Sequence, residues 1–432
     1  MLMKQTASQT TKGPQAILDA GSSKLSALIF ETGLDGTPAI LGHAMHASDG
    51  IRKGEVIDLD KFATAMGKTV QAAERNAGLT VSQLHITTSG GRPASHICRH
   101  KIDLSDTRIG RRELRRLQSR LAESNPAAGH QIVQTQMLQY IVDDQTHVKN
   151  PIGMQGRKLA ADYLLLSMSG LTLDNFRLAA AQNHLLLGEV HHSASLAGFA
   201  SLDSDERELG CLQLDLGAGT SSVAIFMDGE MVFADSIDMG SHNITRDLAQ
   251  VLSLSMADAE RLKVMEGSVM PSPTLPTASL PFPATGDNFV VSDRVNPADL
   301  LPLSNGEVIE RQLVNDIIRC RVEEILELVN QRIRHAGMQQ VAGRRVTLSG
   351  GGAQLTGLAD FVAHRWNKHV VLAKTASLRG SEELSSSLSH TAAFGMVHHL
   401  QTRQKEPAAS PSNRPSIFNA FGRFGHWLNE NI

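Results

Sequence analysis

The sequence contains no long hydrophobic run and few cysteines. Its longest apolar stretches, such as Tyr163 to Leu166, fall far short of the roughly 18 residues that a membrane-spanning helix requires. The three cysteines, Cys98, Cys211 and Cys320, are far apart and form no CxxC pair, which is typical of a protein in a reducing compartment. A membrane-spanning protein and a disulfide-stapled scaffold are therefore excluded.

Neither sign of charge dominates the chain. The 41 Lys and Arg residues against 44 Asp and Glu give a net charge of −3, so no global field attracts nucleic acid. We expect no nucleic-acid partner. The 432 residues suffice for about two to four domains. Residues 1–14 are polar and lack the apolar segment of a signal peptide, which predicts a disordered leader.

Several common site motifs are missing. Neither a GKS/T phosphate loop nor a GxGxxG turn occurs, which disfavours the P-loop and Rossmann folds. The chain has 18 histidines but no HExxH and no paired Cys/His spacing. We therefore expect isolated histidines rather than a histidine metal site.

Two segments repeat one arrangement of strands and turns. Residues 16–33 (AILDAGSSKLSALIFETG) and 211–238 (CLQLDLGAGTSSVAIFMDGEMVFADSID) each place a Gly-rich turn between two apolar runs, and Asp228-Gly229 leads the second into a third strand. This repetition predicts two related halves. Residues 86–171 lie between them, carry a basic helical stripe from Arg108 to Arg120, and are predicted to form an inserted subdomain.

The remaining segments alternate helices, loops and one more glycine turn. Two helices are predicted within 239–267, proline-rich loops or an edge hairpin within 270–302, and a long amphipathic helix within 308–337. Residues 345–366 (RVTLSGGGAQLTGLADFVAHRW) predict a strand, a glycine loop and a helix.

The two hairpin turns have the chemistry of a phosphate site. Asp19 and Asp215 each end a strand and precede small residues whose backbone N–H groups can converge on phosphate oxygens. Two carboxylates can also hold Mg²⁺ through its water ligands. The glycines at 350–352 allow a flat ligand to approach the backbone.

These motifs together resemble the actin, Hsp70 and sugar-kinase superfamily and, within it, the FtsA family of bacterial cell-division proteins. The resemblance runs from Ala16 to Val397 and resumes in the tail. It is carried by DAGSSK, KNPIGMQGRKLAAD, ERELG, ITRDLA, AERLKVMEG, IIRCRVEEILELV and LSGGGAQLTGL. It implies an α/β, actin-like two-domain fold with an inserted side subdomain in the first half.

The resemblance also implies domain boundaries. The first half would comprise residues 15–85, 172–208 and 360–399, with 86–171 inserted as subdomain 1C. The second half would comprise 209–238 and 318–359, with 239–317 as subdomain 2B. Residues 400–415 would form a linker and 416–432 an amphipathic membrane-targeting helix.

The site that the resemblance implies binds ATP with Mg²⁺, the metal held through water by Asp19 and Asp215. Phosphate, ribose and adenine contacts would come from Asp19, Gly21, Ser22, Ser23, Lys24, Asp215, Gly217, Ala218, Gly219, Thr220, Glu260, Lys263, Gly350, Gly351, Gly352 and Ala353. The chain has Ala218 and Ser221 where the family usually has glycine and threonine, and Glu189 is a weak candidate for orienting a water. We therefore expect weak ATPase activity or none.

Two further sites are implied. Arg319, Arg321 and Glu324 match the helix that receives the C-terminal peptide of the tubulin-like protein FtsZ. At about 100° per residue, one apolar arc of about 180° on the tail collects Ile417, Phe418, Phe421, Phe424, Trp427 and Leu428. Such a helix after a proline-containing linker is typical of a membrane-surface anchor.

The implied function is an actin-like ATP-binding protein that polymerises on the inner face of the cytoplasmic membrane at the division septum. There it would tether the FtsZ ring and recruit later division proteins. Two alternatives remain at this point, namely a small-molecule kinase of the same superfamily and an actin-like pilus-assembly protein.

Overall fold

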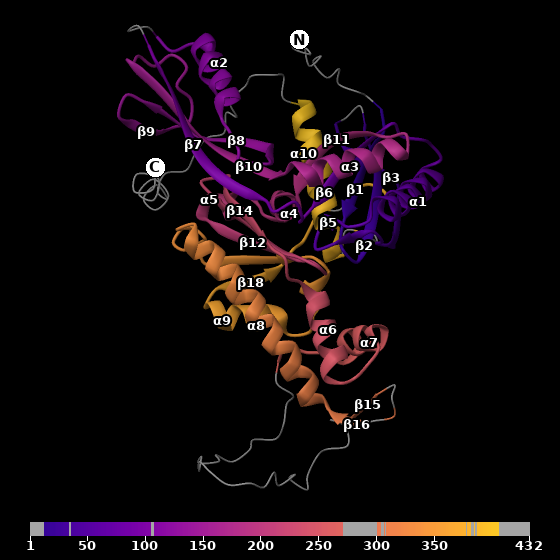
Figure 1. Cartoon of the computed structure of the whole chain (residues 1–432). Coiled ribbons are helices and arrows are strands. Elements are labelled where there is room, and N and C mark those ends of the chain that lie inside the picture. Colours follow the sequence, from indigo (N-terminus) through magenta and orange to yellow (C-terminus); the bar gives the residue numbers. More distant parts are fainter. Residues whose placement is uncertain are drawn as a thin grey trace, which may run out of the picture.

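The computed structural model describes residues 13–33, 36–104, 108–270, 300–303, 306, 308–376, 378–381, 384 and 387–405 (Figure 1). Most of the predicted leader, the segment 271–299 and the whole amphipathic tail lie outside the described residues. No helix in the described ranges combines the length and apolarity needed to cross a bilayer.

The first half is built on a five-stranded sheet in the order β11-β6-β1-β2-β3. Helices α1 and α3 pack on one face, and β4 and β5 form a short hairpin between β3 and α1. The bounds are β1 (Gln15–Ala20), β2 (Lys24–Thr32), β3 (Pro38–Ala47), β4 (Ile51–Arg52), β5 (Glu55–Val56), α1 (Leu59–Ala77), β6 (Gln83–Thr88), α3 (Gly170–Gln182) and β11 (Leu186–His192).

The second half contributes five strands, β18-β17-β12-β13-β14, to a nine-stranded sheet. Their core also takes in α6 to α9. The bounds are α5 (Ser204–Leu209), β12 (Cys211–Leu216), β13 (Ser221–Met227), β14 (Glu230–Ile237), α6 (Ser241–Val251), α7 (Met256–Glu266), β15 (Leu300–Pro302), β16 (Val308–Glu310), α8 (Arg311–His335), β17 (Arg345–Ser349), α9 (Leu358–Trp366) and β18 (His369–Leu372).

The inserted segment supplies the other four strands of that sheet. Its strands and helix are β7 (Ala94–Asp103), α2 (Arg111–Ser119), β8 (His130–Val142), β9 (Gln145–Val148) and β10 (Lys158–Ser169). In sequence, the insertion lies between β6 and α3 of the first half. In space, its strand β7 pairs with β14 of the second half through one residue pair, Asp235 with Ala94. It projects from the body of the molecule in Figure 1.

The hydrophobic patterns explain the predicted elements. Both strands of the first hairpin are largely buried, which suits the near-continuous apolar sequence of β1 and β2. Helix α8 presents one apolar stripe at helical spacing to the core, formed by Val314, Ile318, Val322, Ile325, Leu326, Val329 and Ile333. In the insertion, Ile109 and Leu117 are buried beneath the basic stripe, whose Arg111, Arg112, Arg115, Arg116 and Arg120 are exposed.

One helix lies against the other face of the first sheet. Helix α10 (Thr391–Lys405) packs on β1 and β2 and on helix α4 (Ser193–Ser201), which itself lies mainly against β12 and β13 of the second sheet. Leu400 is buried in that cluster. The linker was predicted to begin at residue 400, and this boundary is wrong because α10 continues to Lys405.

Two other predicted boundaries are wrong. Residue 360 was expected to begin the return to the first half, but β18 pairs in parallel with β17, and Val362 and Ala373 lie in the core of the second half. Residue 86 was expected to begin the insertion, but it lies inside β6, which pairs with β1 in the first sheet. Both errors arise because long-range strand pairing, rather than local pattern, decides which sheet a segment joins.

Candidate functional site

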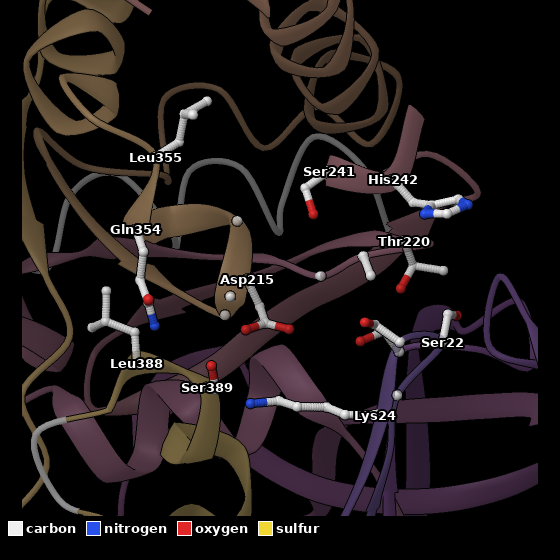
Figure 2. Close-up of a pocket in the computed structure, with 18 of the residues that line it drawn as sticks. Ser22, Lys24, Asp215, Thr220, Ser241, His242, Gln354, Leu355, Leu388 and Ser389 are labelled. Atoms are coloured by element: carbon white, nitrogen blue, oxygen red, sulfur yellow. The ribbon is translucent and has the colours of Figure 1, made fainter. Parts of the chain in front are cut away.

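A cleft of about 590 Å³ lies between the two halves, and residues of both hairpin turns line it. Figure 2 shows Ser22 and Lys24 on one side and Asp215 and Thr220 on the other, with Ser241 and His242 beyond Thr220. Fourteen of the sixteen residues predicted from the resemblance line the cleft, since only Gly219 and Ala353 are absent from its lining.

In the first turn, a hydrogen bond from a neighbouring strand fixes the carboxylate of Asp19. Asp19, in β1, accepts a hydrogen bond of 2.7 Å from the Thr87 hydroxyl of β6. A Cβ on Gly21 would lie 2.8 Å from the Lys24 carbonyl, so the tight turn requires glycine there. The Ser22 hydroxyl accepts a 3.0 Å hydrogen bond from the Gly54 backbone N–H.

The second turn repeats this construction. Asp215, in β12, accepts a 2.8 Å hydrogen bond from the Ser349 hydroxyl of β17. The turn is closed by a 2.9 Å hydrogen bond from the Gly217 N–H to the Thr220 carbonyl. The predicted relation between the two halves is thus visible in the local geometry of both turns.

Two carboxyl groups face each other in this cleft. Burial, together with the charge of Asp215, raises the pKa of Asp19 to about 6, while the Thr87 hydrogen bond and Lys24 oppose that rise. Burial also raises the pKa of Asp215, and the Ser349 hydrogen bond opposes it. Burial lowers the pKa of Lys24, whose ammonium extends toward Asp215 and Ser389 in Figure 2. A bound divalent cation would relieve the repulsion between the two carboxylates.

The glycine triplet at the end of β17 is shaped by the neighbouring strand. Gly350 has φ +85, and a Cβ on it would lie 2.5 Å from the Leu216 carbonyl and 2.9 Å from Asp215 Oδ1. Gly351 is exposed, and a Cβ there would meet only Ser389 Oγ at 3.7 Å. Ala353, also predicted to contact the adenosine, is buried beside the cleft rather than in its wall.

An ion pair on α7 forms another wall. The Lys263 ammonium, which is nearly buried, donates to Glu260 at 2.7 Å and to the Thr245 hydroxyl of α6 at 3.0 Å. Burial raises the pKa of Glu260, but the hydrogen bonds from Lys263 and Thr245 outweigh it and leave that pKa lowered. The two side chains therefore reach the cleft as an ion pair that is fixed to α6 through Thr245.

Sequence reasoning missed several residues of the lining. The N-terminus of α6 opens into the cleft because the Ser241 and His242 N–H groups bond the Gly217 and Ala218 carbonyls, at 2.9 and 2.8 Å. A Cβ on Gly240 would lie 2.6 Å from both carbonyls, so a glycine directly before a predicted helix was the available signal. The other missed lining residues include Ser89, Ser193, Gln354, Leu355, Leu388 and Ser389.

Glu189 does not line the cleft. It lies on β11 and accepts hydrogen bonds from His191 Nε2 at 2.9 Å and His399 Nε2 at 3.2 Å. The imidazole rings of His191 and His399 are 4.3 Å apart between centroids. The expectation of isolated histidines is therefore wrong for this pair, because α10 brings together residues far apart in sequence.

The predicted peptide-binding residues on α8 already have partners. Arg321 makes a bidentate ion pair with Asp247 of α6, with N···O distances of 2.6 and 3.0 Å, and also contacts Glu324 one turn along α8. Arg319 pairs with Asp316 on its own helix. Arg321 thus ties α8 to α6, the helix whose N-terminus enters the cleft.

Comparisons with known proteins agree with this architecture. The family profile described as "Cell division protein FtsA" matches residues 212–395, and that of the "SHS2 domain inserted in FTSA" matches 90–167, the inserted segment. The structure is similar to the PilM-PilN type IV pilus biogenesis complex (TM-score 0.59, 14% identity, 92% of this chain and 100% of the other). It is also similar to MreB5 of Spiroplasma citri bound to ADP (TM-score 0.52, 12% identity, 91% and 97%).

At these identities the two structures establish the fold, which is actin-like with an insertion in the first half. The relationship in sequence is closer. The "Cell division protein FtsA" of Rhizobium meliloti is 30% identical over 437 aligned positions, which cover 96% of this chain and 94% of that protein. The chain therefore belongs to the FtsA family of bacterial cell-division proteins.

Proposed function

We propose that this protein binds ATP with Mg²⁺ in the cleft. The observation that carries the proposal is the pair of carboxylates in the cleft, partly buried Asp19 and buried Asp215, which lie on equivalent turns of the two halves. The similar MreB5 structure is bound to ADP. Magnesium would supply positive charge between the carboxylates and the phosphates, held through its water ligands.

The chain's own groups would orient the nucleotide. Residues of both turns line the phosphate region, where backbone N–H groups of small residues would bind phosphate oxygens. The first N–H groups of α6 are bonded to the second turn, so α6 would hold that turn in place for the phosphates. Lys24 adds a cation to the same region. The fixed pair Glu260 and Lys263 would contact ribose and adenine, and the open face of Gly351 would allow the base to lie against the backbone.

We further propose slow hydrolysis or none. Glu189, the side chain considered for orienting the attacking water, is held by two histidines on β11 and α10 and does not line the cleft. In addition, the methyl group of Ala218 lies in the cleft wall where the family usually has glycine. A cleft of this kind favours a nucleotide-dependent structural state over rapid turnover.

At the cellular level, we propose that the protein polymerises on the inner face of the cytoplasmic membrane and tethers the FtsZ ring at the division septum. Membership of the FtsA family supports this role, as does the amphipathic sequence 416–432, which lies outside the described residues. The FtsZ peptide would bind near α8, and later division proteins would join the assembled filament. One short helix binds membrane reversibly, so many tails on one polymer would supply firm attachment.

Vesicle co-sedimentation of the full chain with ATP tests the tether. Trp427→Glu places a charge on the apolar arc and should leave the protein in the supernatant, while Asn419→Asp, on the polar face, should sediment like the wild type. Removal of residues 411–432 should abolish sedimentation. Equal sedimentation of all variants would contradict membrane anchoring by the tail.

The kinase alternative predicts a different result. A kinase needs an acceptor substrate and an unpaired catalytic base in the cleft. Among the described lining residues, the acidic side chains are Asp19, Asp215 and Glu260, of which Glu260 is paired with Lys263. Transfer of phosphate from ATP to a sugar or small acid, with no dependence on the tail, would favour the kinase.

A further inference from the structure

A second cluster of chemically reactive side chains lies outside the cleft. Glu189, His191 and His399 converge so that one ligand atom from each lies within 4.8 Å of the other two. The two histidine Nε2 atoms approach the same carboxylate oxygen, Glu189 Oε2, at 2.9 and 3.2 Å. The cluster is independent of the proposed nucleotide site.

The fold creates this cluster from two elements. Glu189 and His191 are two residues apart on strand β11, so both side chains point to the same face of the sheet edge. Helix α10 packs across that face of the sheet through Phe394 and Val397, and it delivers His399. The His191 side chain is only 4% exposed, whereas those of Glu189 and His399 are 28% and 26% exposed.

These distances match the requirements of a small transition-metal site. With ligand bonds of about 2.0–2.2 Å, the ligand atoms of a tetrahedral zinc ion are about 3.3 Å apart. Two of the three pairs already lie within a few tenths of an ångström of that value. The two imidazole rings are inclined at 58°, and the remaining pair of ligand atoms lies within 4.8 Å.

We propose that Glu189, His191 and His399 bind a Zn²⁺ ion, with water as the fourth ligand. Two imidazoles and one carboxylate suit zinc, whereas Mg²⁺ and Ca²⁺ prefer oxygen ligands. The partial exposure of Glu189 and His399 provides a path for the ion and room for the water ligand. The Glu189 N–H also donates a 3.0 Å hydrogen bond to His85 Nδ1, which fixes the backbone that carries the carboxylate.

The ion would join α10 to β11 close to the nucleotide cleft. Ser193, which lines the cleft, is two residues after His191. Ala392, in the first turn of α10, lines the cleft as well. Zinc would therefore hold the last described helix against the sheet edge that leads into the cleft. The measurable consequence is slower hydrogen exchange in the backbone of α10.

The test is calorimetric titration of zinc chloride into the full-length, untagged, metal-free protein at neutral pH. The wild type should bind one tight equivalent, and Co²⁺ in its place should give the visible absorption of a low-symmetry site. His399→Ala should weaken zinc affinity by about 100-fold or more, because even the loss of a residue that supports a ligand can cost that much. His369→Ala, which removes an exposed histidine on β18, should bind as the wild type does.

Further measurements distinguish a zinc ion in this cluster from a metal ion bound in the cleft. Asp215→Asn should keep the zinc site intact, because that carboxylate belongs to the cleft. Zinc should slow exchange in α10 of the wild type but not of His399→Ala, and circular dichroism should show both folded. Absence of a tight equivalent, or equal affinity of wild type and His399→Ala, would overturn the proposal and leave a hydrogen-bonded Glu-His-His cluster.

Discussion

Gly219 packs against Ser22 across the cleft so closely that a Cβ on Gly219 would lie 2.5 Å from Ser22 Oγ and 2.8 Å from Ser22 Cβ. Gly219 was predicted to contact phosphate, yet it is buried between the two turns, beside Lys53. It therefore sets the distance between the turns of the two halves rather than presenting a surface to the cleft.

Gly219→Ala should consequently weaken nucleotide binding. The added methyl group would force the turns apart, which misaligns two sets of N–H groups, and we expect an approximately tenfold loss of ATP affinity by calorimetry. Ala218→Gly in the same turn removes a methyl group from the cleft wall and should bind ATP at least as tightly as the wild type. Unchanged affinity of Gly219→Ala would show that the turns separate without cost.

Asp215→Asn tests the carboxylate at the centre of the cleft. The amide keeps the shape of the side chain and can still accept from Ser349, so the fold should persist, but Mg²⁺-dependent ATP affinity should fall at least tenfold. Calorimetry with and without Mg²⁺ separates the two contributions. Full Mg²⁺-dependent affinity in the folded variant would remove Asp215 from the proposed site.

The raised pKa of Asp19 predicts a pH-dependent stability. Its folded pKa of about 6 lies above the ordinary value of 3.8, so the folded state holds this proton more tightly, and its contribution to stability is lost as pH rises between these values. Without ligand at pH 7.5, Asp19→Asn should therefore be more stable than the wild type by roughly 1 to 3 kcal/mol.

Thermal unfolding across pH 4.5 to 8 measures this difference, which should shrink toward low pH. Glu31→Gln, an exposed change on β2, serves as the control and should change stability little. Mg²⁺ with ATP should stabilise the wild type more than Asp19→Asn, reversing the order. A wild type that is the more stable protein without ligand at pH 7.5 would contradict the burial of this charge.

Arg321→Glu should lower the stability of the protein and its ATP affinity as well as its affinity for a partner peptide. It would place a third negative charge beside Asp247 and Glu324, and we expect a loss of about 1 to 3 kcal/mol in stability by denaturant unfolding. Because Asp247 lies on α6, ATP affinity should fall as well. Unchanged ATP affinity in a folded Arg321→Glu variant would contradict a coupling between the Arg321–Asp247 pair and the cleft.

Arg319→Glu is the more selective test of peptide binding. Arg319 pairs with Asp316 on the same helix, so its loss should leave the α6–α8 contact and ATP binding intact. Fluorescence anisotropy with the FtsZ C-terminal peptide should show weaker binding to this variant. Equal peptide affinity would place the peptide site elsewhere on the surface.

The ATPase prediction is quantitative. Turnover should lie far below the typical enzyme range of about 1 to 1,000 per second, because the side chain considered for orienting water lies on β11 outside the cleft. Phosphate release is the measurement, with Asp19→Ala as the control for contaminating ATPase. Several turnovers per second that disappear in this control would refute the prediction.

The sequence predicts most of the elements and much of the cleft because local chemistry determines them. A buried strand that ends in aspartate and continues into small residues places Asp19 and Asp215 without further information. The stripe on α8 likewise predicts its buried face. What these patterns share is that neighbours in sequence decide the outcome.

The other features depend on contacts between distant segments. Ser241 and His242 enter the cleft because α6 bonds to the second turn, and no pattern within α6 indicates this. The pairing of β18 with β17 and the meeting of Glu189 with His399, 210 positions apart, are of the same kind. Such contacts are decided by the arrangement of whole elements, so a single sequence carries little signal for them.

The pairing of Asp235 with Ala94 makes the insertion a mechanical link between the halves. Its chain ends are rooted in the first half, between β6 and α3, while its strands continue the sheet of the second half through that pair and the hydrogen bonds between Ser95 and Ala234. A change in the angle between the two halves would therefore bend one of these attachments. The angle at which the insertion projects should thus report the state of the cleft to any protein that contacts it.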